Sequence, residues 1–168
     1  MTPTRRTFLS AAAASAGLEA LTPRPTLASA AEHAQQARRG SDPWIQVDTA
    51  ALRANATSLA ALAGGRPILA VIKNNGYGLG TVEVARALDG HQALAGFAVV
   101  KVSAALALRN AGIELPVLHM GATTPGESTE LVAADVRLSA FQDSDPVHIG
   151  GLAESFRKRI PVHVYVDT

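Results

Sequence analysis

Along this chain, segments with a strand-type pattern of apolar residues alternate with segments that have a helix-type pattern. Short runs of consecutive apolar residues, typical of strands buried on both faces, precede stretches whose apolar residues recur at helical spacing. The predicted strands occupy residues 44–48, 68–72, 96–100, 116–121, 136–141 and 161–167. The predicted helices occupy residues 49–63, 81–88, 103–109, 125–134 and 145–158, the last with a weak point at Gly150-Gly151.

Helical spacing also predicts which side of two helices faces the core. The predicted buried residues are Leu52, Leu59 and Leu62 in the first helix and Val82, Ala85 and Leu88 in the second. Asp48 or Thr49 is the expected N-cap of the first helix, and Gly64-Gly65 ends it.

From residue 68 onward, strands and helices alternate at a spacing of roughly 20–25 residues, which implies parallel strands joined by right-handed crossovers. The predicted fold class is α/β, a partial (β/α)8 barrel of the TIM type with about five of its eight strands present. In the last strand Val162, Val164 and Val166 alternate with His163, Tyr165 and Asp167. One set suits packing against outer helices and the other a polar barrel interior.

One lysine stands out because it directly follows a buried strand. Lys73 comes after the apolar run 68–72 and before residues 74–80, which contain three glycines and Tyr77. Ligands bind at the carboxyl ends of strands in α/β barrels. A Schiff base forms from a neutral amine, which a partly desolvated strand end favours. The spacing alone is equally typical of a solvated lysine at a strand end, with the glycines making a turn.

Residues 70–80, Ala-Val-Ile-Lys-Asn-Asn-Gly-Tyr-Gly-Leu-Gly, closely resemble the cofactor-lysine motif of the alanine racemase family, the fold-type III pyridoxal-phosphate enzymes. The resemblance implies that Lys73 forms the Schiff base with pyridoxal 5'-phosphate and that Tyr77 donates its hydroxyl to the cofactor phosphate. Gly76 stands where alanine is usual. Leu79 stands where histidine is common, so any hydrogen bond made by that histidine is absent.

Other segments resemble the same family. They are the strand ending in Asp48 with Asn55 beyond it, residues 105–113, and the final strand with His163, Asp167 and Thr168. Ser103-Ala104 replaces an acidic pair usual in the family. Tyr165 stands where many members have a lysine that can be carbamylated and that orients an active-site arginine, so the sequence does not predict that arrangement. His163 also suits a satisfied core histidine, and Asn55 an exposed helix residue.

The family resemblance implies a two-base interconversion of L- and D-alanine, or of a wider set of amino acids, in a homodimer. Lys73 would be one base and a tyrosine from across the dimer the other. The family's remaining three barrel strands and β-rich C-terminal domain are not in this sequence, so we expect the chain alone to be inactive. A non-catalytic pyridoxal-phosphate-binding protein and a non-functional gene fragment are the alternatives.

Composition narrows the function classes. The chain has 168 residues, enough for one domain and little more, with 48% apolar residues to form a core. Its net charge of +1 argues against nucleic-acid and acidic-membrane partners. The absence of cysteine excludes disulfides and cysteine metal sites, and the histidines lack metal-binding spacing, so no metal is predicted. Lys101 is the rival Schiff-base lysine, but no glycine-rich loop follows it.

The first residues have the pattern of an export signal. Arg5-Arg6 precedes Phe8 and Leu9 at twin-arginine spacing, an alanine-rich stretch follows, and Ala28-Ser29-Ala30 suits cleavage. That apolar stretch is too short to span a membrane. We therefore predict a twin-arginine signal at 1–30, a linker at 31–43 and a truncated racemase-like barrel domain at 44–168, in a periplasmic or secreted protein. A basic N-terminus without signal function is the alternative.

Overall fold

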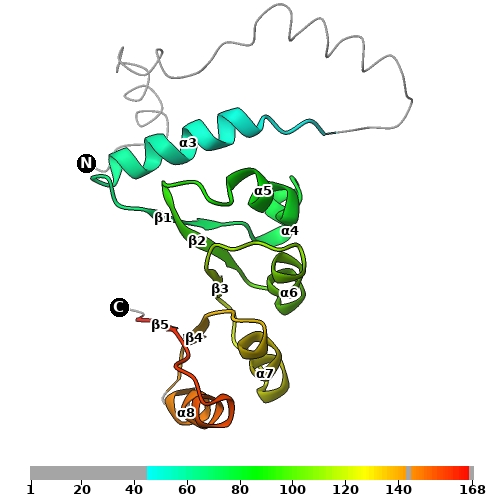
Figure 1. The fold of residues 1–168 in the computed structure, drawn as a ribbon, viewed down its shortest axis with the longest axis vertical. Helices are drawn as coiled ribbons and strands as arrows, with labels where there is room; N and C mark the ends of the chain where they lie inside the picture. The colour runs from blue at the N-terminus through cyan, green and yellow to red at the C-terminus, as the bar shows by residue number, and fades with distance from the viewer. Residues whose placement is uncertain (1–44, 143–144, 167–168) are drawn as a thin grey trace, which may run out of the picture. The chain divides into compact units, whose positions relative to one another are not determined.

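The computed structural model describes residues 45–142 and 145–166 (Figure 1). The predicted signal peptide and linker, with Trp44, Asp167 and Thr168, lie outside these residues. The helices are α3 (Thr49–Leu62), α4 (Lys73–Tyr77), α5 (Thr81–Leu88), α6 (Val102–Asn110), α7 (Pro125–Ala133) and α8 (Asp145–Phe156). The strands are β1 (Ile68–Val71), β2 (Leu94–Val99), β3 (Val117–His119), β4 (Leu138–Ala140) and β5 (Val162–Val164).

All the described strand pairs are parallel and follow chain order. Strands β1, β2 and β3 form one hydrogen-bonded sheet, and β4 pairs with β5. An isolated bridge between Leu118 and Arg137 joins the two sets, with the Arg137 N–H donating to the Val117 carbonyl at 2.8 Å. The predicted parallel α/β arrangement with five barrel strands is therefore confirmed.

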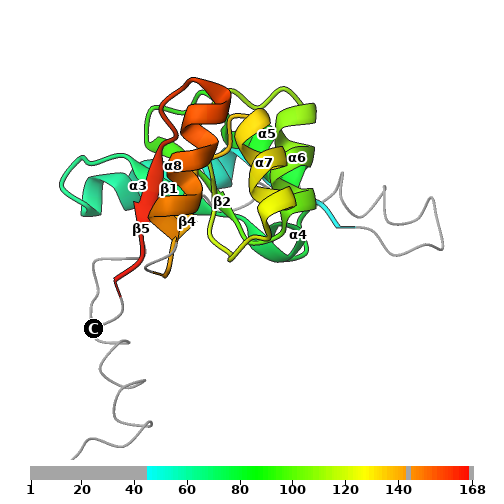
Figure 2. The same cartoon turned by 90° about the horizontal axis from the view of Figure 1, so that it is seen from below.

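The core lies between the strands and the crossover helices. Figure 2 shows α5, α6, α7 and α8 side by side along the strands. Phe97 of β2, Leu108 of α6 and Leu131 of α7 are wholly buried there. Ala85 and Leu88 of α5 are also buried, as predicted, and Val82 packs against the same core from its edge. The crossover helices thus cover one face of the sheet, as right-handed βαβ units require.

Helix α3 begins as predicted, but the side of the helix that faces the core is not the predicted one. The Asp48 carboxylate caps it by accepting the Ala51 N–H at 2.9 Å. Leu52 is partly buried, but the prediction for Leu59 and Leu62 is wrong, because these side chains are 54% and 85% exposed. The buried positions are Ala56 and Ala60, whose small side chains let the helix lie close to its neighbours α5 and β1.

One other local prediction is wrong. Residues 45–48 form no strand, because among the described residues no strand lies beside them and Asp48 is engaged as the α3 cap. Helix α8 forms where it was predicted and continues through Gly150 and Gly151. In the described part of the chain, none of the helices is both long and apolar enough to span a membrane.

Two charged side chains hold the loop that leads into β3. The Asp89 carboxylate accepts the Glu114 and Leu115 N–H groups, both at 3.1 Å. The Arg109 guanidinium donates to the Ile113 and Leu115 carbonyls at 2.7 and 3.0 Å. These bonds satisfy backbone groups that cannot join the sheet ladder. They fix the amino-terminal end of β3 against α5 and α6.

His119, the last residue of β3, is a polar exception in the core. Its side chain is 1% exposed, and neither ring nitrogen has a hydrogen-bond partner among the described residues. A Cβ atom on Gly121 would lie 3.0 Å from the His119 ring, so the chain turns tightly over it. Burial lowers the pKa of His119 below its ordinary value of 6.5. The neutral ring is therefore the form that suits the fold.

We expect His119→Leu to raise the free energy of unfolding by about 1 kcal/mol, because it removes an unpaired buried polar group. The wild-type gain from a neutral His119 should be present above pH 6.5 and should fall as the pH drops below that value, since the unfolded chain takes up the proton first. Urea titrations at pH 7.5 and 5.5 should therefore show a steeper acid loss in wild type than in His119→Leu. Equal losses would contradict this account.

Candidate functional site

Lys73 lies at the carboxyl-terminal end of β1, as predicted. Beyond the strand, the Ile72 N–H donates to the Ala98 carbonyl at 2.9 Å, so the sheet hydrogen bonding continues to the residue before the lysine. The Ile72 side chain is buried in the core, whereas Lys73 is only partly buried. No hydrogen bond or ion pair in residues 45–142 and 145–166 involves the Lys73 amine. An amine held this way is open to a ligand at the edge where barrel enzymes bind theirs.

The residues after Lys73 form a left-handed turn. The φ angles of residues 74, 75, 76, 77 and 78 are 52°, 55°, 60°, 55° and 93°. Asn and Gly adopt this region at low cost, but for Tyr77 it is uncommon. The left-handed backbone therefore explains why Asn and Gly are frequent in the segment Asn-Asn-Gly-Tyr-Gly.

Hydrogen bonds tie this turn to the strand before it and the helix after it. The Ile72 carbonyl accepts the Gly76 N–H at 3.2 Å and the Thr81 hydroxyl at 3.3 Å. The Asn75 carbonyl accepts the Gly80 N–H at 2.8 Å. Thr81 is buried at the start of α5, and sequence reasoning did not single it out. Its position directly after a glycine-rich turn is the signal that could have identified it.

Gly76 and Tyr77 occupy opposite environments in the turn. Gly76 is buried, and a Cβ atom there would lie 3.3 Å from the Thr81 nitrogen and 3.4 Å from a Val84 methyl group. Tyr77 is 62% exposed. Lys73 and Tyr77 are the first and last residues of α4, so the turn presents an amine and a phenol on one rigid segment.

This pair of groups fits pyridoxal phosphate in its chemistry. A primary amine at the strand end can join an aldehyde, and an exposed phenolic O–H can donate to a phosphate. The open backbone around Gly78, where an added Cβ would meet nothing within 4 Å, leaves room beside both groups. The assignment of Lys73 and Tyr77 to the cofactor remains a prediction.

The rival lysine lies on the neighbouring strand end in a different setting. Lys101 is exposed and precedes α6 in an extended conformation, with φ −87° and ψ 133°. Its carbonyl accepts the Ala104 N–H at 3.1 Å, as an ordinary helix start does. No left-handed turn surrounds it, so Lys73 is the better candidate.

The other predicted residues lie away from this turn. Asn55 is exposed on α3, which agrees with its interpretation as a surface helix residue. His163 is exposed in β5, in register with Ser139 of β4, so it is not a core histidine. The ring of Tyr165 packs 5.2 Å from that of Phe141, at an interplanar angle of 39°. Phe141 had not been singled out, because nothing local in the sequence pairs it with Tyr165.

A hollow of about 360 Å³ lies at the same carboxyl edge, beside β4 and α8. Its polar lining includes Thr123, Gln142, Asp145 and His148. The Asp145 carboxylate accepts the Phe141 and Gln142 N–H groups, which lowers the pKa of Asp145. His148 Nε2 lies 2.7 Å from the buried hydroxyl of Ser128. Within the described residues, no cluster of side chains could hold a metal ion.

Comparison with known proteins identifies the family. Residues 47–168 match the family described as "Alanine racemase, N-terminal domain". The chain belongs to this family. The alanine racemase of Desulforamulus reducens is 35% identical over 127 residues, which cover 74% of this chain and 34% of that protein. The alanine racemase of Frankia casuarinae is 40% identical over 124 residues, which cover 73% of this chain and 32% of that protein.

Solved structures give the same answer for the fold. An alanine racemase from Clostridium difficile 630 in complex with cycloserine matches with a TM-score of 0.63 at 26% identity, covering 74% of this chain and 35% of that one. The alanine racemase from Streptomyces coelicolor A3(2) matches with a TM-score of 0.64 at 28% identity, covering 72% and 32%. The TIM-type barrel prediction is therefore confirmed. The chain spans about a third of the length of these relatives.

Substitutions at two glycines should separate backbone strain from packing in the turn. Gly76→Val should lower the free energy of unfolding by about 2 kcal/mol or more, because a β-branched residue is disfavoured at φ +60° and its Cβ crowds Thr81. Gly64→Val, at φ +71° with nothing within 4 Å, carries the backbone cost alone. Urea unfolding of both variants measures the difference. A loss at Gly76 no larger than at Gly64 would refute tight packing of the turn.

Proposed function

We propose that this chain forms the cofactor-binding part of a pyridoxal-phosphate-dependent alanine racemase, with Lys73 as the cofactor lysine. The observation that carries the proposal is the partly buried, unpaired amine at the end of β1, followed by an ordered left-handed turn. The turn lies within the residues that match the family.

Each residue of the turn has a separate task in this proposal. The Lys73 amine would hold the cofactor and, as a free amine, would remove or return the proton at the α-carbon of the amino acid. The Tyr77 hydroxyl donates a hydrogen bond to the cofactor phosphate, and such bonds to charged groups are the strong ones. Bound pyridoxal phosphate supplies an electron sink for the α-carbon. Thr81 and Gly76 keep the turn in the conformation that orients both groups.

The proposed substrate, oligomeric state and second base are those that the family resemblance implies. The substrate is alanine or a wider set of amino acids, and the working form is a homodimer in which the second base is a tyrosine from the partner subunit. A racemase needs this second group because the two proton transfers occur on opposite faces of the α-carbon. Since Lys73 serves one face only, racemisation would also need the second base.

One observation favours a second candidate, a protein that binds pyridoxal phosphate without racemising amino acids. Tyr165 stands at the position of the family lysine, and its ring packs on Phe141. An aromatic pair there cannot replace the charge of a carbamylated lysine. The two candidates differ in proton transfer: cofactor binding without exchange of the α-hydrogen of alanine into D₂O would favour the second.

The N-terminal arginine pair supports export of the protein by the twin-arginine route, which carries folded proteins. When residues 1–43 are fused to a reporter that is active only after export, we expect activity from the natural sequence. Changing both Arg5 and Arg6 to Lys should abolish it, because the route selects for arginine at this pair. Unchanged reporter activity in the double variant would contradict the proposed periplasmic or secreted location.

A spectroscopic experiment tests the role of Lys73 against the rival lysine. The full chain mixed with pyridoxal phosphate should develop a visible absorption band, and borohydride should fix the cofactor to the peptide containing residue 73. Lys101→Ala is the matched control and should behave like the natural chain, since it removes a lysine from the adjacent strand end. Lys73→Ala should show no band. A band that persists in Lys73→Ala, or a label on Lys101, would overturn the assignment.

A further inference from the structure

A second hollow lies at the opposite edge of the sheet from Lys73. It has a volume of about 290 Å³ and lies at the amino-terminal ends of β3, β4 and β5. Its charged lining residues are Arg109, Glu114, Asp135, Arg137, Lys158 and Arg159. Four are cationic and two are acidic, so an excess of positive charge surrounds a small space.

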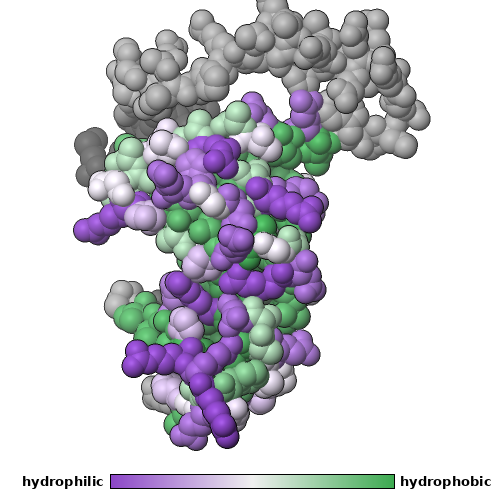
Figure 3. Space-filling view, in the orientation of Figure 1, coloured by the Kyte–Doolittle hydropathy of each residue, from purple (hydrophilic) through white to green (hydrophobic). Residues whose placement is uncertain are grey.

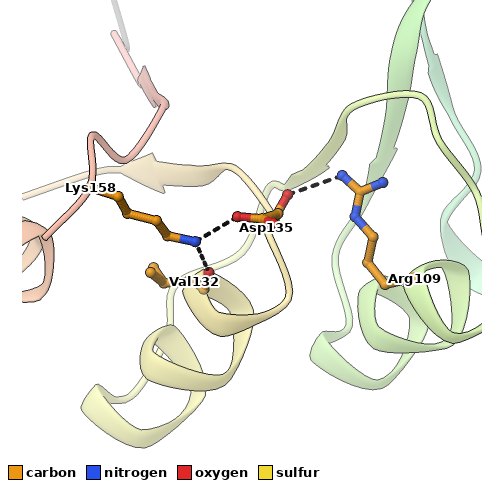
Figure 4. A network of polar contacts seen from close by, with 4 residues as sticks. All are labelled: Arg109, Val132, Asp135 and Lys158. Atoms are coloured by element: carbon orange, nitrogen blue, oxygen red, sulfur yellow. Dashed lines mark hydrogen bonds and ion pairs between the residues drawn. The ribbon is translucent and has the colours of Figure 1, made fainter. Parts of the chain in front are cut away.

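Two of the cations are already engaged. Figure 4 shows Lys158 and Arg109 reaching Asp135 from opposite sides. The Lys158 ammonium lies 2.5 Å from the Asp135 carboxylate and donates to the Val132 carbonyl at 2.7 Å. Arg109 donates to the Asp135 backbone carbonyl at 3.0 Å, and its other bonds hold the loop before β3. Asp135 is thus paired with Lys158, and its charge also favours the charged form of Arg109.

The other two cations have no partner among the described residues. Neither Arg137 nor Arg159 forms an ion pair or a side-chain hydrogen bond there, although Glu114 lines the same hollow. Arg137 lies close enough to Arg109 for the two charges to repel. Burial lowers the pKa of Arg109, and the charge of Arg137 lowers it further, against the opposing effect of Asp135 and Asp89. Like charges gathered around one hollow are stabilised by an anion.

We propose that this hollow binds a small oxyanion carrying two negative charges, a phosphate group or a dicarboxylate, between Arg137 and Arg159. Guanidinium groups match such oxyanions with paired N–H donors. The volume, at the lower end of the range for ligand sites, suits a small ligand. Arg137 begins the approach to β4 and Arg159 that to β5, so the ligand would join two strands at their amino ends.

The site is independent of the cofactor turn. Lys73 follows the carboxyl end of β1, whereas this hollow opens at the amino ends of three other strands. The proposal therefore does not depend on the function assigned to Lys73, and an anion bound here would stabilise the fold without touching the reacting groups.

Thermal unfolding of the full chain in the presence of anions tests this site. The probes are inorganic phosphate, succinate and, at matched ionic strength, chloride. We expect phosphate or succinate to raise Tm by on the order of 2–5 °C at ten times Kd, with Tm then increasing in proportion to the logarithm of the anion concentration, and chloride to give no such rise. A rise with only one of the two would identify the ligand class. No rise with either, or an equal rise with chloride, would overturn the proposal.

Variants locate the binding. Arg137→Gln and Arg159→Gln should each weaken the phosphate or succinate response at least tenfold in Kd. Arg86→Gln, at an exposed position in the last turn of α5, is the charge-matched control and should leave Kd unchanged. Tyr77→Phe should also leave it unchanged, which separates this site from phosphate binding near the cofactor turn. Comparing Tm without anion shows that each variant folds. Unchanged Kd in both arginine variants would contradict the site.

Discussion

Packing of the crossover helices against one face of a parallel sheet is the constraint on which the rest of this structure depends. Parallel neighbours cannot be joined by hairpins, so each strand is followed by a helix that must return across the sheet. Phe97, Leu108 and Leu131 fill the space between the two layers. At β5 this packing leaves apolar surface uncovered: Val164 is 73% exposed, and hydrophobic surface shows on the left of Figure 3. An edge of this kind is one that proteins normally cover.

The same connections separate the two edges of the sheet. At the carboxyl edge the chain leaves each strand. There Lys73 is partly exposed and is followed by the left-handed turn. At the amino edge the chain enters each strand, and charged side chains are used to hold the loops. Asp89 and Arg109 are tied to backbone groups there. Lys73 and the Lys158–Asp135 ion pair therefore lie at opposite ends of the strands.

From residue 68 onward, local patterns in the sequence predicted the order of the strands and helices, except for the short α4, and singled out Lys73 as a candidate. Helical spacing placed Ala85 and Leu88 correctly, but it favoured Leu59 and Leu62 over Ala56 and Ala60, because spacing does not show how closely two helices approach. Residues 44–48 were predicted to form a strand, yet strand formation needs a neighbour, which a local pattern cannot supply.

The candidate site and the arginine hollow differ in how far apart their residues lie in the sequence. Lys73, Gly76, Tyr77 and Thr81 lie within nine residues, so one motif could reveal them together, and the structure added the handedness of the turn and the role of Thr81. The arginine hollow is built from three separate loops, and its side chains meet only because parallel strands bring successive amino ends to one edge. Its charge excess is also invisible in a net charge of +1. Sequence patterns therefore reveal sites within one turn, while sites that depend on the crossover topology appear only in the folded chain.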